Sequence, residues 1–148
     1  TTAFDIAPSA IAMAGERFPE SAVDYQVADL FNPPQSWSGA FDVVIEIFTI
    51  QALPLHLRPE AFAKITSLLK PGGKLFVVSF ARTAADARGN PKPIPQPLRM
   101  PWPLTKEELD TFQAVGLTEV SCNEVADPDN PKVRRFIAEY TRPEPAAS

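Results

Sequence analysis

Residues 41–48 constrain the fold of this chain more strongly than any other stretch. They read Phe-Asp-Val-Val-Ile-Glu-Ile-Phe, a nearly continuous apolar run with one acid, Glu46, late in the run. Such a run is typical of a strand that is buried on both faces of a parallel sheet. A helical pattern follows at 59–70, and a second apolar run follows at 74–80. Because strand–helix–strand is the repeating unit of doubly wound folds, the order predicts an α/β fold.

A strand at 1–5, a helix at 8–18 and a strand at 23–28 are expected before this unit. Pro8 suits the first turn of a helix, because the N–H group that proline lacks would have no helical partner there. Pro19 ends the same helix. Residues 1–28 are therefore predicted to form a strand–helix–strand pattern of their own.

After the central unit, Lys70 and the tight turn Pro-Gly-Gly at 71–73 are expected to end the middle helix. A capping box beginning at Thr105 starts a further helix, which Gly116 ends. Two alternating stretches at 117–125 and 132–141 then predict an antiparallel hairpin.

Composition limits the class of protein. The chain has 148 residues, 22% charged residues and a net charge of −4, which argues against a general nucleic-acid binder. No apolar run approaches the roughly 20 residues needed to span a bilayer. The single cysteine, Cys122, excludes an internal disulfide and fits a reducing compartment. We expect a cytoplasmic protein with one domain at 1–142 and a disordered tail at 143–148.

A long irregular stretch at 81–103 carries six prolines between Pro91 and Pro103. Long loops in compact domains are usually functional or disordered, and prolines favour an ordered lid. Basic residues and one tryptophan in this stretch are candidates for an acceptor site: Arg82, Arg88, Arg99 and Trp102. The alternative is that the arginines are solvated and that the tryptophan packs the lid.

Three predicted strands end in an acid: Asp5, Asp29 and Glu46. In a parallel sheet these carboxylates project from the edge where open α/β folds bind their ligands. One carboxylate can accept both hydroxyls of a ribose, a second can accept from a purine amine, and a third can orient an amine-bearing group. The alternative is that they are turn or strand-end acids with structural roles.

Four segments stand in a defined order: Phe-Asp-Ile-Ala-Pro-Ser-Ala-Ile at 4–11, Val-Ala-Asp-Leu-Phe at 27–31, Phe-Asp-Val-Val-Ile-Glu at 41–46 and Leu-Lys-Pro-Gly-Gly-Lys-Leu at 69–75. Together they resemble the class I S-adenosylmethionine-dependent methyltransferases, near the thiopurine methyltransferase-like branch. The resemblance covers almost the whole chain. It implies a Rossmann-like, mostly parallel sheet with helices on both faces and a C-terminal antiparallel hairpin.

The resemblance also implies roles for individual residues. S-adenosylmethionine would be the cofactor and a small molecule the methyl acceptor. Asp5 and Ile6 would contact the ribose end, and Asp29 and the backbone of Leu30 the adenine. Glu46 and the residues that follow it, Ile47 to Gln51, would line the pocket near the methionine end and the acceptor. Gln51, Arg82, Arg99 and Trp102 are the candidates for the acceptor side. Methyl transfer needs positioning more than a general base, so no catalytic residue and no metal ligand are expected.

The sequence departs from the family in one respect, because it contains no Gly-rich loop after a first strand. The missing strand would lie between the strand at 1–5 and the strand at 41–48. We therefore expect a fragment of a longer enzyme. Strand edges that lack a partner invite pairing, so a homodimer through exposed edges is also expected.

Two other functions stay open. The chain could be a non-catalytic, methyltransferase-like module that binds a partner, or a nucleotide-sugar or dinucleotide-binding domain, since Asp5 could serve any ribose. Three further polar residues are interpreted as structural or surface residues: Asp42, His56 and Cys122.

Overall fold

The computed structural model describes residues 1–82 and 102–146. The chain divides into two compact units, Thr1–Trp37 (unit 1) and Ser38–Ser148 (unit 2). Each unit has its own sheet, and each is described on its own. The predicted boundaries of a domain at 1–142 and a tail at 143–148 stay predictions.

Unit 1 is a small strand–helix–strand motif. Its elements are β1 (Thr2–Asp5), α1 (Pro8–Arg17), β2 (Asp24–Val27) and a short 3₁₀ turn at Gln35–Trp37. Strands β1 and β2 pair in parallel, from Thr2 opposite Asp24 to Asp5 opposite Val27. The rings of Phe4 and Trp37 lie 5.0 Å apart between centroids, and Trp37 is buried. The three elements predicted here from the sequence are confirmed.

Unit 2 holds a four-stranded sheet. Its elements are β3 (Phe41–Ile47), 3₁₀ turns η2 (Ile50–Ala52) and η3 (Leu55–Leu57), α2 (Arg58–Leu68), β4 (Leu69–Phe80), α4 (Lys106–Leu109), α5 (Thr111–Ala114), β5 (Thr118–Ala126) and β6 (Arg134–Thr141). The strand order is β3-β4-β6-β5. The β3–β4 pair is parallel, whereas β6 runs antiparallel to both of its neighbours. The fold is therefore α/β with a mixed sheet, and the C-terminal hairpin is confirmed.

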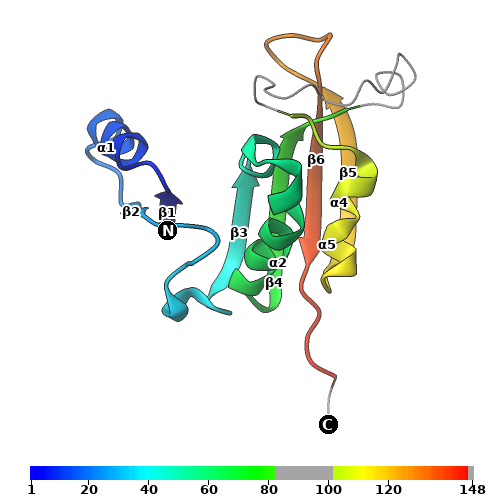
Figure 1. Cartoon of the computed structure of the whole chain (residues 1–148), viewed down its shortest axis with the longest axis horizontal. Coiled ribbons are helices and arrows are strands. Elements are labelled where there is room, and N and C mark those ends of the chain that lie inside the picture. The colour runs from blue at the N-terminus through cyan, green and yellow to red at the C-terminus, as the bar shows by residue number, and fades with distance from the viewer. Residues whose placement is uncertain (83–101, 147–148) are drawn as a thin grey trace. The chain divides into compact units, whose positions relative to one another are not determined.

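One face of this sheet is covered by α2, α4 and α5, which Figure 1 shows in front of the strands. An aromatic core fills the space between: Phe62 packs edge-on against Phe112 at 4.6 Å, and Phe112 lies 5.1 Å from Tyr140. All three rings are buried. Leu75 and Val77 of β4 face the same core and are fully buried.

The opposite face of β3 is exposed. Val43, Ile45 and Ile47 are all at least half exposed, and Ile45 is 63% exposed. Within the described residues β3 pairs with β4 alone, so it forms an edge of the sheet of unit 2. The expectation that residues 41–48 are buried on both faces is therefore wrong for this structure, because the helices described in unit 2 cover one face.

The Pro-Gly-Gly segment differs from its prediction. Helix α2 already ends at Leu68, and residues 71–73 belong to β4 instead of forming a separate tight turn. Arg142 explains the difference, since Gly72 N–H donates to its carbonyl at 2.8 Å and Gly73 carbonyl accepts from its N–H at 2.9 Å. A Cβ on Gly73 would lie 2.8 Å from the carbonyl oxygen of Lys70, so the close approach of the backbone requires glycine here.

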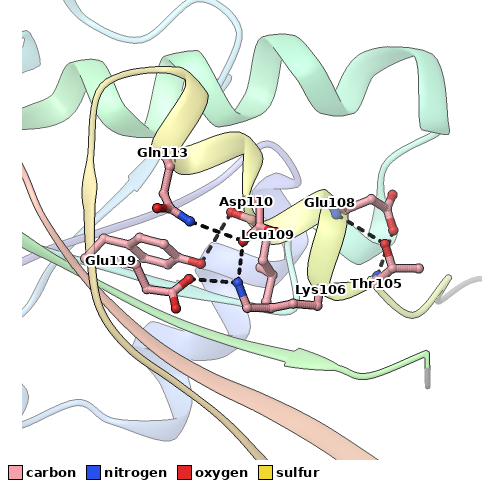
Figure 2. Close-up of polar contacts among 8 residues, drawn as sticks. Thr105, Lys106, Glu108, Leu109, Asp110, Gln113 and Glu119 are labelled. Carbon is pink, nitrogen blue, oxygen red and sulfur yellow. Dashed lines mark hydrogen bonds and ion pairs between the residues drawn. The ribbon is translucent and has the colours of Figure 1, made fainter. Parts of the chain in front are cut away.

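The capping box predicted at Thr105 is present (Figure 2). Its hydroxyl accepts from Glu108 N–H at 3.1 Å, while the Glu108 carboxylate accepts from Thr105 N–H at 2.9 Å. Lys106 lies between the carboxylates of Asp110 and Glu119 and reaches Glu119 at 2.9 Å. The predicted single helix divides at Asp110 into α4 and α5, and Gly116 follows with a φ of 103°.

Candidate functional site

Unit 1 brings two carboxylates to the carboxyl edge of its parallel strands. Asp5 is the last residue of β1, and its carbonyl accepts from Ala28 N–H at 3.1 Å just beyond β2. Asp29 follows one residue later. The Oδ1 atom of Asp5 accepts from Ala7 N–H at 2.8 Å, and Oδ1 of Asp29 accepts from Phe31 N–H at 2.9 Å. These turns fix both side chains, and a carboxylate has further acceptor positions for a ligand.

The two apolar residues named with these acids differ in exposure. Ile6 is 67% exposed directly after Asp5, whereas Leu30 is buried. An exposed isoleucine beside an exposed carboxylate offers one apolar and one polar contact to the same ligand. Because the Leu30 side chain is buried, only its backbone is open to contact with a ligand.

In unit 2, Glu46 lies near the carboxyl end of β3 with a side chain only 4% exposed. Its Oε1 accepts from Thr49 N–H at 2.7 Å and from Ile50 N–H at 3.0 Å, so it holds the start of the turn that follows β3. Its Oε2 is buried and has no hydrogen-bond partner among the described residues. Burial raises the pKa of Glu46 above its ordinary value, although the two backbone N–H groups act in the opposite direction.

The residues predicted for the acceptor side lie in different environments. Gln51 is buried, its Oε1 accepts from Phe80 N–H at 2.7 Å, and its carbonyl accepts from Trp102 N–H at 2.9 Å. Arg82 is exposed. Trp102 is half-buried, and its Nε1 is buried without a partner in the described chain. Arg88 and Arg99 lie outside the described residues.

Gln51 therefore joins two segments that are far apart in the sequence. Through its side chain it binds the end of β4, and through its backbone it binds Trp102. The structure places Gln51 as a support beside Phe80, with its side-chain oxygen already engaged.

Arg58 was not predicted as a site residue, yet it is only 3% exposed at the start of α2. Its guanidinium forms an ion pair with Glu108, donates to the carbonyl of Trp102 at 2.8 Å and donates to the carbonyl of Leu53 at 3.3 Å. A sequence signal was absent, because arginine before proline at a helix start is typical of a solvated position.

Two other residues lie near the carboxyl edge: Phe48 falls within the segment at 47–51 that was expected to line the pocket, whereas Arg135 was not predicted. Phe48 has a φ of 60°, in the left-handed region, and Arg135 pairs with buried Asp127. The Asp-Pro-Asp-Asn-Pro loop at 127–131 gave a turn signal, which Asp127 satisfies by accepting from the N–H groups of Asp129 and Asn130. Nothing in the sequence marked Arg135 as its partner.

The remaining candidates take ordinary positions. Asp42 pairs with Lys70 at 3.0 Å near the amino end of β3, and His56 is exposed in η3. Burial raises the pKa of the Cys122 thiol, which disfavours the thiolate that a nucleophile needs. In the described ranges no group of three or more His, Cys, Asp or Glu residues could hold a metal ion. The described helices also include none with the length and apolar character to cross a membrane.

Known methyltransferases resemble this chain in sequence. A ubiquinone biosynthesis O-methyltransferase of Xanthomonas axonopodis pv. citri is 37% identical over 87 residues, which are 57% of this chain and 35% of that enzyme. A thiopurine S-methyltransferase of Vibrio atlanticus is 26% identical over 94 residues, 64% of this chain and 39% of that enzyme. The chain thus spans well under half the length of these curated relatives.

A solved structure supports the same fold. The N-methyltransferase NodS from Bradyrhizobium japonicum WM9, in complex with S-adenosyl-L-homocysteine, aligns with a TM-score of 0.72 and 21% identity. The alignment covers 97% of this chain and 66% of that one. The model of the methyltransferase domain family matches residues 1–77, which include β1, β2, β3 and most of β4. This chain belongs to the methyltransferase domain family.

Proposed function

We propose that the chain is part of an S-adenosylmethionine-dependent methyltransferase that acts on a small-molecule acceptor. The observation that carries the proposal is the pair Asp5 and Asp29, fixed by backbone N–H groups at the carboxyl edge of a parallel pair. Open α/β sheets bind ligands at this edge. The related enzymes are named as O-, S- and N-methyltransferases, and NodS was solved with S-adenosylhomocysteine.

In unit 1, Asp5 accepts from the ribose hydroxyls of the cofactor. Ile6, exposed next to it, packs on the same end of the ligand. Asp29 accepts from the adenine amine, and the backbone of Leu30 completes that contact. Carboxylates suit both tasks, because ribose hydroxyls and the adenine amine are donors.

In unit 2, Glu46 and Ile47 serve the methionine end of the cofactor. The Oε2 atom of Glu46 is a buried acceptor without a partner in the described residues, and an ammonium group is the kind of donor that satisfies it. Arg82 and Trp102 serve the acceptor side, and Gln51 supports this side through its hydrogen bonds to Phe80 and Trp102. Arg99, which lies outside the described residues, is the remaining candidate for the acceptor side. Transfer is an in-line displacement at the sulfonium methyl group, which depends on positioning.

Calorimetric titration with S-adenosylhomocysteine tests this function. We expect the 148-residue chain to bind the ligand and Asp5→Asn to weaken binding about tenfold or more, because a hydrogen bond to a charged group contributes about 1.5–3 kcal/mol. Asp24→Asn is the matched control, since Asp24 begins β2 at the opposite edge. No binding by the parent chain, or equal loss in both variants, would favour a non-catalytic partner-binding module.

The same proposal includes a homodimer through the edge of β3. Val43, Ile45 and Ile47 present an apolar row, and Asp42, the one acid at the start of the strand, is already paired with Lys70. Natural edge strands usually carry a charge that prevents pairing. Light scattering should give a dimer for the parent and a monomer for Ile45→Lys; a monomeric parent would rule the dimer out.

A cytoplasmic location and the absence of a nucleic-acid partner complete the proposal. The net charge of −4 argues against a nucleic-acid partner. The single unpaired cysteine, Cys122, fits the reducing environment of the cytoplasm. Fractionation of cells that express the natural protein checks the location.

A further inference from the structure

The turn after β3 holds a phenylalanine in a strained backbone conformation. Phe48 has a φ of 60°, which is uncommon for a bulky residue other than glycine. Three hydrogen bonds hold it there: Phe48 N–H donates to the carbonyl of Val78 at 3.0 Å, and the next two N–H groups donate to Glu46. Backbone strain of this kind persists where the surroundings enforce it, and it concentrates at functional sites.

The strained residue takes part in an aromatic pair with a cation above it. The rings of Phe48 and Phe80 are stacked, with centroids 4.9 Å apart and planes at 23°. The guanidinium carbon of Arg135 lies 5.3 Å from the Phe48 centroid and 5.6 Å from the Phe80 centroid. All three residues are partly exposed, and the Arg135 side chain is 23% exposed.

Arg135 is oriented by an ion pair with Asp127. Its Nη2 pairs with Asp127, which is itself buried and fixed by two backbone N–H groups of its own loop. This pair orients the guanidinium, and the Asp127 carboxylate offsets its positive charge, so recognition there depends on directed N–H donors more than on long-range attraction. A guanidinium that is oriented before binding loses little entropy for each hydrogen bond it forms.

These three residues stand at the carboxyl ends of β3 and β4 and the start of β6, which is the ligand-binding edge of an open sheet. We propose that Phe48, Phe80 and Arg135 contact the methyl acceptor and select one with a planar ring that bears a carboxylate. The two rings provide a surface for the planar group, and the guanidinium donates to the carboxylate. This inference rests on the proposed function and specifies its acceptor class.

Binding of benzoate and benzamide tests the inference, because the two probes share a ring and differ in charge. Equilibrium dialysis of the 148-residue chain should show benzoate bound at least fivefold more tightly than benzamide. Arg135→Gln should remove that preference. Arg134→Gln is the matched control, since Arg134 is the neighbouring residue of the same strand and pairs with Glu124 instead.

A second measurement protects the test against a variant that fails to fold. In amide NMR spectra of the parent chain, benzoate should shift the resonances of Phe48, Phe80 and Arg135. Equal affinity for the two probes, no binding of either, a preference that survives Arg135→Gln, or one that Arg134→Gln also removes would overturn the inference. Titration of the same samples with S-adenosylhomocysteine judges the proposed function separately, and Arg135→Gln should leave that affinity unchanged.

Discussion

Replacement of Arg58 by methionine should destabilise unit 2 strongly. Methionine keeps the length and apolar stem of the side chain but removes every donor. The change leaves Glu108 without its cation and two carbonyls, those of Leu53 and Trp102, without their side-chain donor. Breaking a buried ion pair costs about 3–5 kcal/mol. Because the Glu108 side chain is 28% exposed, we expect the lower end, about 3 kcal/mol.

Urea unfolding followed by far-ultraviolet circular dichroism measures this cost. Because each kcal/mol shifts Tm by about 4 °C in a domain of this size, a thermal scan should show a Tm that is lower by about 12 °C. Lys70→Met is the matched control, since the Lys70–Asp42 pair is exposed, with side chains 45% and 82% accessible. Exposed pairs contribute less than about 1 kcal/mol. A loss at Arg58 no larger than at Lys70 would refute the reasoning.

A double-mutant cycle locates the effect. Glu108→Gln in the Arg58→Met background should cost at least about 1 kcal/mol less than in the parent, because the acid has already lost its partner. Additive losses would show that Arg58 acts through the two carbonyls alone.

Three further predictions concern single positions. Because burial raises the pKa of Glu46 above its ordinary value of 4.5, the folded state holds a proton on Glu46 more tightly than the unfolded state, and stability falls as the pH rises above 4.5. Glu46→Gln should flatten this fall of Tm with pH, and an unchanged slope would contradict the prediction. Gly73→Ala should cost about 1–3 kcal/mol in urea unfolding, since its Cβ would meet the Lys70 carbonyl at 2.8 Å, whereas Gly15→Ala, with open space around it, should be neutral or stabilising. Thr105→Ala should cost about 1 kcal/mol in the same assay because it removes the cap of α4, and no change would exclude the cap as a stabilising contact.

Local patterns predicted most elements of the fold. The alternation in 117–125 and 132–141 found the β5–β6 hairpin, and the spacing of Thr105 and Glu108 found a cap that the structure contains. These signals depend on neighbours in the sequence. The burial of β3 does not, because it depends on which elements cover each face of the sheet. Val43, Ile45 and Ile47 are apolar but exposed for that reason.

The candidate site follows the same division. Asp5, Asp29 and Glu46 could be found because an acid at the end of an apolar run is visible in the sequence. Arg58 and Arg135 could not, because each takes its role from a partner in another element: Arg58 from residues up to 50 positions away, and Arg135 from rings on β4 and after β3. The Pro-Gly-Gly segment was misread for a similar reason, since Arg142 pairs with it from the far end of the unit.

The position of β6 has a consequence for biosynthesis. This strand is the last of unit 2 in the sequence, yet it lies between β4 and β5 and pairs with both. Lys74 of β4 pairs with Thr141 of β6, which is synthesised 67 residues later. The ribosome therefore releases β3, α2 and β4 well before the sheet can be completed. Contacts of such long sequence separation form slowly, and the nascent chain carries an open β4 edge during that interval. Chaperone binding to a released chain that ends before residue 134 should therefore exceed binding to the released 148-residue chain.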